Sequence, residues 1–82
     1  MILTANEAAA FSALLTECRD TGVCPTLSRI QDTAGIPRGS VGAALRRLGD
    51  LGLVRQHYWR GPYVPLRDER GRRVEMAIVV SS

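Results

Sequence analysis

Several residue types are scarce or missing in this chain of 82 residues, and each gap argues against a class of function. There is one histidine, His57, and no serine, cysteine or acid stands near it in the spacing of a catalytic triad. No glycine-rich loop is followed by Lys-Ser or Lys-Thr, as a loop that cradles phosphates requires. Acidic residues are scattered singly. We therefore expect no enzyme and no catalytic residues.

The chain also has few side chains that could bind a metal ion or a cofactor. The only soft ligands are Cys18, Cys24 and His57, whereas a structural zinc site usually takes four cysteine or histidine ligands. We expect no metal and no cofactor. The two cysteines fit a structural role in a reducing compartment, and a redox switch is the alternative.

Long apolar segments are missing as well. No run approaches the roughly 20 apolar residues that a membrane span needs. Residues 1–3 are too few, and lack the basic start, for a signal peptide. A chain of this length also leaves little room for a ligand pocket of about 300 Å³. The expectation is one domain, residues 1–82, in the cytoplasm with the nucleoid, without a membrane or a small-molecule ligand as partner.

Lysine is absent, so all eleven cationic side chains are arginine, and their distribution is uneven. Residues 1–36 carry two arginines and four acids, a net charge of −2. Residues 38–73 carry nine arginines and three acids, a net charge of +6. Codon bias in a GC-rich genome explains the choice of arginine over lysine, but not this asymmetry. A strongly cationic half of a chain suggests a polyanionic partner.

Residues 4–20 are predicted to form the first helix. Thr4 and Glu7 have the spacing of a capping box, in which each side chain binds the other residue's backbone N–H. Ala8, Phe11 and Leu15 then share one helical face. This face serves either the core or, as an alternative, a dimer contact.

Two shorter helices are predicted next, over residues 26–34 and 37–50. Thr26 can cap the first, and Gly35 can adopt the left-handed backbone that ends it. Pro37 suits the first turn of the second helix, because its missing N–H would be unpaired there. The apolar side chains of the second helix fall on one face and its glycines and arginines on the other.

From residue 53 the apolar period changes from 3.6 to 2, which is typical of strands. Strands are predicted at about residues 53–60 and 72–80, around a charged turn at residues 67–73. Residues 63–66 form a further extended run between them. The aromatic side chains Tyr58, Trp59 and Tyr63 either clamp this region to the helices or stack on a partner.

The order of these elements resembles winged helix-turn-helix DNA-binding domains, such as MarR-type regulators and the amino-terminal domain of LexA-type repressors. The resemblance rests on residues 26–27, 34–36 and 51–54, with Val41, Leu45 and Leu48 between them. It implies an α+β fold of three helices followed by a β-hairpin wing. It also implies a brief strand at residues 23–25 that pairs with the wing.

In such a fold, residues 37–50 are the recognition helix, which enters the major groove of double-stranded DNA. Arg38 and Ser40 would meet base edges, and Arg46 and Arg47 would meet phosphates. A phosphate would also lie near the start of the preceding helix, and the charged turn would reach a flanking minor groove or backbone. The candidate DNA-binding residues are Thr26, Ser28, Arg38, Gly39, Ser40, Gly42, Ala43, Arg46, Arg47, Arg67, Arg70, Arg72 and Arg73.

The predicted function is sequence-specific binding of double-stranded DNA by a small, repressor-like transcriptional regulator of bacterial or phage type. A single domain covers a short site, which would suit a homodimer, although no segment shows the interface. The alternative is a winged helix that serves as a protein–protein adaptor and does not read DNA. Arginines that only keep the surface solvated would fit that alternative.

Overall fold

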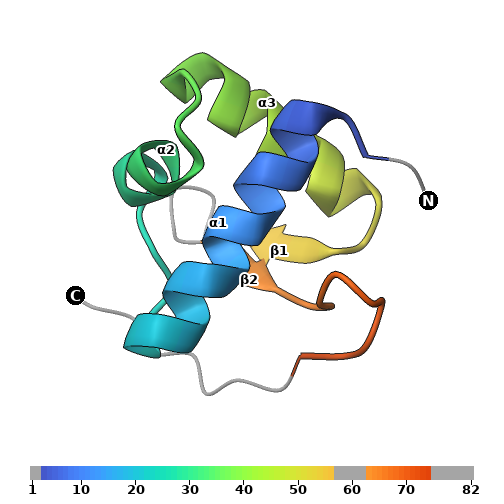
Figure 1. The fold of residues 1–82 in the computed structure, drawn as a ribbon. Helices are drawn as coiled ribbons and strands as arrows, with labels where there is room; N and C mark the ends of the chain where they lie inside the picture. The colour runs from blue at the N-terminus through green and yellow to red at the C-terminus, as the bar shows by residue number, and fades with distance from the viewer. Residues whose placement is uncertain (1–2, 57–62, 75–82) are drawn as a thin grey trace.

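Three helices followed by a two-stranded antiparallel sheet make up the computed structural model, which describes residues 3–56 and 63–74 (Figure 1). The elements are α1 (Ala5–Thr21), α2 (Leu27–Ala34), α3 (Arg38–Asp50), β1 (Val54–Gln56) and β2 (Tyr63–Pro65). This arrangement confirms the predicted α+β class and the winged helix-turn-helix architecture. None of the helices in these described ranges is long and apolar enough to cross a membrane.

The ends of α1 and α2 follow the local sequence signals. The Thr4 hydroxyl accepts from the Glu7 N–H at 3.2 Å, and the Glu7 carboxylate accepts from the Thr4 N–H at 3.1 Å, so the capping box is confirmed. Thr26 caps α2 by accepting from the Arg29 N–H at 3.2 Å. Gly35 ends α2 in the left-handed conformation, with φ of 70°. These bonds satisfy backbone groups that helix ends leave unpaired.

The start of α3 differs slightly from the prediction. Pro37 is the N-cap residue and has extended backbone, with ψ of 149°, so the first helical residue is Arg38. Pro37 cannot offer a side-chain oxygen to the free N–H groups that follow it, and no side-chain cap is present. The first turn of α3 therefore keeps backbone donors available for an external acceptor.

Helix α1 crosses the other elements (Figure 1), and one apolar cluster of buried side chains joins them. Phe11 and Leu14 of α1 belong to it, together with Ile30 of α2 and Leu45 and Leu48 of α3. Leu14, Ile30, Leu45 and Leu48 are fully buried. Burial of a leucine-sized side chain contributes about 1.5–3 kcal/mol. The core therefore fixes which side of α3 faces inward.

The strand that pairs with β1 is β2, in the register Val54–Pro65, Arg55–Val64 and Gln56–Tyr63. Residues 63–66 are predicted to be extended, whereas the second wing strand is predicted at residues 72–80. Val64 and Pro65 are buried, so this run has the apolar side chains that the core takes up. Residues 57–60 and 75–80, which include His57, Tyr58 and Trp59, lie outside the described residues, so the predicted strands there are not tested.

Residues 23–25 do not form the brief strand that the resemblance implies, within the part of the chain that the structure describes. Cys24 and Pro25 are buried, while the Val23 N–H donates to the Thr21 hydroxyl at 3.1 Å. Proline has no N–H for a strand ladder. The segment instead serves as a buried link between α1 and α2.

Candidate nucleic-acid interface

Helix α3 has two chemically different sides. Val41, Ala44, Leu45 and Leu48 point into the core. The other side carries arginines and very small residues that are exposed or half-buried. Its candidate residues are Arg38, Gly39, Ser40, Gly42, Ala43, Arg46 and Arg47. The structure therefore brings the seven α3 candidates onto one accessible helix, as the periodicity predicts.

Two positions on this accessible side hold glycine although nothing in the described part of the chain requires a glycine there. Gly39 and Gly42 have no positive φ, and a Cβ added to either would meet nothing within 4 Å. Glycine in a helix interior costs about 0.5–1 kcal/mol relative to alanine. Neither the backbone conformation nor the packing among the described residues offsets that cost. A bare backbone on this side instead allows close approach by another molecule.

The start of α2 is the second place where candidates gather. Thr26 and Ser28 are both exposed there. The Thr26 oxygen accepts the cap bond, which leaves the hydroxyl proton free to donate to an external oxygen. The positive end of the helix dipole adds a modest attraction for anions.

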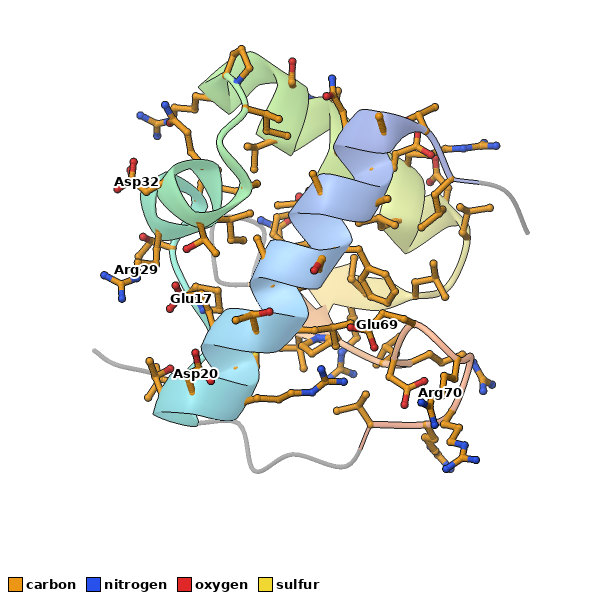
Figure 2. All side chains as sticks on the ribbon, viewed as in Figure 1. Glu17, Asp20, Arg29, Asp32, Glu69 and Arg70 are labelled. Atoms are coloured by element: carbon orange, nitrogen blue, oxygen red, sulfur yellow. The ribbon has the colours of Figure 1, made fainter. Side chains whose placement is uncertain are left out.

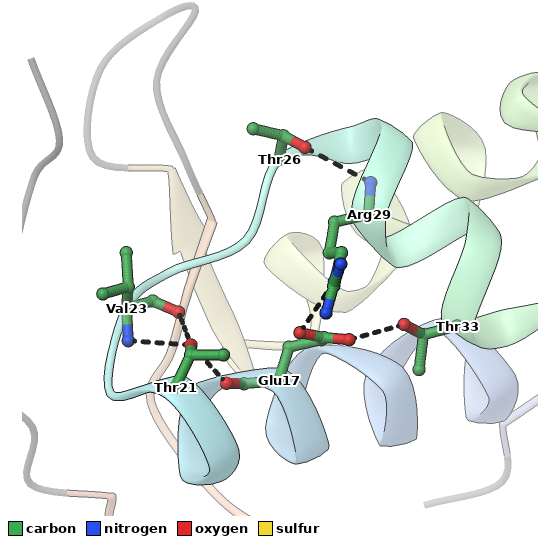
Figure 3. A network of polar contacts seen from close by, with 6 residues as sticks. All are labelled: Glu17, Thr21, Val23, Thr26, Arg29 and Thr33. Atoms are coloured by element: carbon green, nitrogen blue, oxygen red, sulfur yellow. Dashed lines mark hydrogen bonds and ion pairs between the residues drawn. The ribbon is translucent and has the colours of Figure 1, made fainter.

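A buried carboxylate that is not among the predicted site residues holds α2 against α1. Glu17 of α1 has 8% of its surface exposed and lies beside Arg29 of α2 (Figure 2). Its carboxylate accepts from the Thr33 hydroxyl at 2.7 Å and from Arg29 Nε at 3.1 Å (Figure 3). Arg29 and Thr33 are four residues apart on α2, so they share a face. That spacing, opposite an acid on α1, is the signal that could have found this contact.

The Glu17 contacts predict how stability depends on pH. The Thr33 hydroxyl, and then Arg29, lower the pKa of Glu17 from its ordinary 4.5, although partial burial opposes them. Because the pKa of Glu17 is lower in the folded state, its ionised form stabilises the fold above pH 4.5. This stabilisation is lost as the pH falls through the pKa of the folded state. The melting temperature of the wild type should therefore exceed that of Glu17→Gln at neutral pH, and the gap should shrink in acid. A gap that is equal at pH 7 and pH 3 would contradict this prediction.

The charged turn at residues 67–73 is built around Asp68. One oxygen, Oδ1, accepts from the backbone N–H groups of Arg70 and Arg72, both at 2.9 Å. These bonds, from Arg72 first, lower the pKa of Asp68 below its ordinary value. The Asp68 N–H also donates to the Arg72 carbonyl at 2.8 Å. Gly71 turns the chain with φ of 77°. The turn thus has a defined backbone.

Two further contacts anchor this turn. The Arg67 guanidinium donates to the Gly71 carbonyl at 3.0 Å, and Glu69 pairs with Arg19 of α1 at 3.2 Å. Figure 2 shows the labelled Glu69 and Arg70 on the opposite side of α1 from Arg29. The structure therefore does not place the turn beside α2, and Arg67 is engaged within the turn itself.

Most arginines of the candidate surfaces have no acidic partner among the described residues. Ion pairs there involve only Arg19 and Arg29. The exposed arginines without such a pair are Arg38, Arg46, Arg47, Arg55, Arg67, Arg70, Arg72 and Arg73. Arg55 of β1 is a cation that the candidate set omits. Its outward position follows from the alternation of the strand.

The cysteines pack in the core. Burial, and then the neighbouring Cys24 thiol, raise the pKa of Cys18 from 9.0 to about 12. Burial also raises the pKa of Cys24. Since the thiolate is the reactive form, these values favour the structural role over the redox alternative. Within residues 3–56 and 63–74, no cluster of three or more histidine, cysteine or acidic side chains could hold a metal ion.

A comparison with protein-family models matches residues 3–65 to the family described as "Sugar-specific transcriptional regulator TrmB". The matched range contains all the described helices and strands and ends before the turn at residues 67–73. Neither the curated proteins nor the solved structures include a significant match.

Proposed function

Because the chain belongs to the TrmB family of transcriptional regulators, we propose that it binds double-stranded DNA and reads its sequence with the accessible side of α3. The family is one of regulators and not of enzymes. The observation that carries the proposal is the two-sided character of α3. Buried leucines lie on one side, and glycines and exposed arginines without an ion pair among the described residues lie on the other. A repressor-like mode of action is part of the same proposal.

The geometry of α3 fits a major groove. That groove is about 12 Å wide and admits one helix. Gly39, Gly42 and Ala43 add almost no width to the helix, so its backbone could lie deep. Arg38, in the first turn, can donate two hydrogen bonds to guanine O6 and N7, a contact worth about 1–3 kcal/mol of discrimination. Ser40 would act beside it.

The remaining candidates would hold the DNA backbone. Arg46 and Arg47 would contact phosphates where the helix leaves the groove, and Thr26 and Ser28 would donate to a phosphate near the start of α2. In the proposal, the turn at residues 67–73 reaches the flanking backbone or minor groove through Arg70, Arg72 and Arg73, with Arg67 supporting it. A homodimer would double the length of the site.

The proposal predicts a division of labour between Arg38 and Arg72. Arg38→Ala should lose affinity mainly for the preferred site, which selection from a random duplex pool would identify, and so relax sequence preference. Arg72→Ala should weaken the preferred site and random duplex alike. Equal losses on both duplexes for both variants would contradict these roles.

The dependence on salt tests the proposal as a whole. Six to eight phosphate contacts predict a slope of about −5 to −7 in a plot of log affinity against log salt concentration. A flat response of the wild-type chain would instead favour the adaptor function. The same titration also reports which variants have lost phosphate contacts.

A further inference from the structure

Asp68 is an acidic residue in the middle of a surface that, by the proposed function, binds an anion. Simple electrostatics makes it unfavourable there, because a negative charge repels phosphate. Its carboxylate oxygen Oδ1 nevertheless holds the Arg70 and Arg72 N–H groups, both at 2.9 Å. The two effects have opposite signs for DNA binding, so an experiment can separate them.

We propose that Asp68 is a positioning residue for DNA binding: it holds the turn at residues 67–73 in the shape that presents Arg70, Arg72 and Arg73 to phosphates. The inference rests on the proposed function and deepens it. Truncating this side chain to alanine, which removes the Oδ1 acceptor, should weaken the binding of DNA, although the chain becomes more positive.

Most of the hydrogen bonds within the turn involve this one residue. Besides the two bonds to Oδ1, the Asp68 N–H donates to the Arg72 carbonyl and the Asp68 carbonyl accepts from the Gly71 N–H, at 2.8 and 3.0 Å. The bonds span the turn, which Arg67 and Arg73 close by a single β-bridge. Without the carboxylate, two backbone N–H groups lose their acceptor and the turn gains alternative conformations.

A preformed turn lowers the entropy cost of binding. Ordering a loop or a long side chain on association costs free energy, which a preorganised backbone avoids in part. Arg70, Arg72 and Arg73 are exposed and have no ion pair among the described residues, so their guanidinium groups are not held by a carboxylate there. Glu69 is paired with Arg19, which also fastens the turn to α1.

The test compares Asp68→Ala with Asp68→Asn. Both variants raise the formal net charge by one unit, but asparagine keeps an Oδ1 acceptor for the same two N–H groups. Asp68→Asn should bind duplex DNA as tightly as the wild type or more tightly. Asp68→Ala should bind about fivefold more weakly than Asp68→Asn. Its salt slope should be shallower by about 1–2, since each lost phosphate contact removes about 0.9.

A mutant cycle separates positioning from a general effect on the fold. With Arg70, Arg72 and Arg73 all replaced by glutamine, the difference between Asp68→Ala and Asp68→Asn should vanish, because no side chains remain to be positioned. Gly71→Ala perturbs the same turn without changing its charge, since its φ of 77° is strained for alanine. Gly71→Ala should therefore also weaken the binding of DNA, and it replaces Asp68→Ala in the experiment if Asp68→Ala does not fold.

Equal affinity and equal salt slope of Asp68→Ala and Asp68→Asn, with melting temperatures near that of the wild type, would overturn the positioning role while the proposed function stands. So would a difference that persists in the triple-glutamine background. Failure of the wild-type chain to bind duplex DNA would overturn the proposed function and this inference together. Loss of binding by Arg38→Ala, with equal Asp68 variants, would locate the interface on α3 alone.

Discussion

Replacing both Arg46 and Arg47 with glutamate is expected to weaken the binding of double-stranded DNA by about 100-fold or more. Hydrogen bonds to charged groups contribute about 1.5–3 kcal/mol each, and the new carboxylates would also repel phosphates. Both arginines are exposed on α3 and form no ion pair among the described residues, so no partner within those parts of the chain is lost. The measurement is the dissociation constant for a duplex at about 0.1 M salt.

Two further variants control for net charge and for folding. Replacing both arginines with glutamine removes two positive charges, and Ser12→Glu with Thr16→Glu on the exposed side of α1 adds two negative ones. The two double variants thus have the same net charge. The α1 pair should bind nearly as well as the wild type at physiological salt, because charges more than a Debye length away are screened. Similar losses in both would mean that net charge, and not this helix, governs binding.

Leu45→Ala should cost about 2–5 kcal/mol of the free energy of unfolding. Leu45 is fully buried where α3 packs on α1, and the truncated side chain would leave a cavity. A chain of 82 residues has a total stability of roughly 4–12 kcal/mol at the usual 0.05–0.15 kcal/mol per residue. This single change therefore removes a large share of the stability, which denaturant titration would measure.

The matched control is Leu27→Ala, the same truncation at a half-buried position on α2. It should cost clearly less, because less apolar surface is lost and solvent can fill the space. If the two substitutions cost the same, Leu45 would not be in the core. The accessible side of α3 would then have to be reassigned, and the proposed DNA contacts with it.

The helices could be predicted from the sequence because their signals are local. Thr4 and Glu7 are three residues apart, and Thr26 caps a backbone group three residues ahead. Glycine ends α1 and α2, at Gly22 and Gly35, with φ of 71° and 70°. The inward side of α3 follows from a period of 3.6 residues. Each of these features depends on neighbours within one or two turns.

Strand pairing was less predictable, because it depends on residues that are farther apart and on competition between runs. Residues 63–66 and 72–80 both have the extended character that could pair with β1. The alternation of apolar and polar residues does not show which of the two runs pairs with β1. The structure pairs β1 with Tyr63–Pro65, whose Val64 and Pro65 fill the core. Contacts with the core, which periodicity does not reveal, thus account for the pairing of β1 with Tyr63–Pro65, while residues 75–80 lie outside the described residues.

The roles of the acids were missed for the same reason. Glu17 meets Thr33 across 16 positions, and Arg19 meets Glu69 across 50. The sequence shows that each acid is negatively charged, but it does not show which distant residue each acid contacts. Asp68 is a different case, since its bonds span only two and four residues. There, an aspartate two residues before one arginine and three before a glycine was a local signal of a turn.

The bare glycines of α3 have a consequence for how this protein would respond to selection. If only the stability of the folded chain mattered, alanine would be favoured at position 42, inside α3, with a gain of about 0.5–1 kcal/mol, and by less at position 39 in the first turn. A laboratory screen for heat resistance is therefore expected to enrich the variants Gly39→Ala and Gly42→Ala early. By the proposed function, such stabilised variants would have a thicker α3 and would bind DNA more weakly.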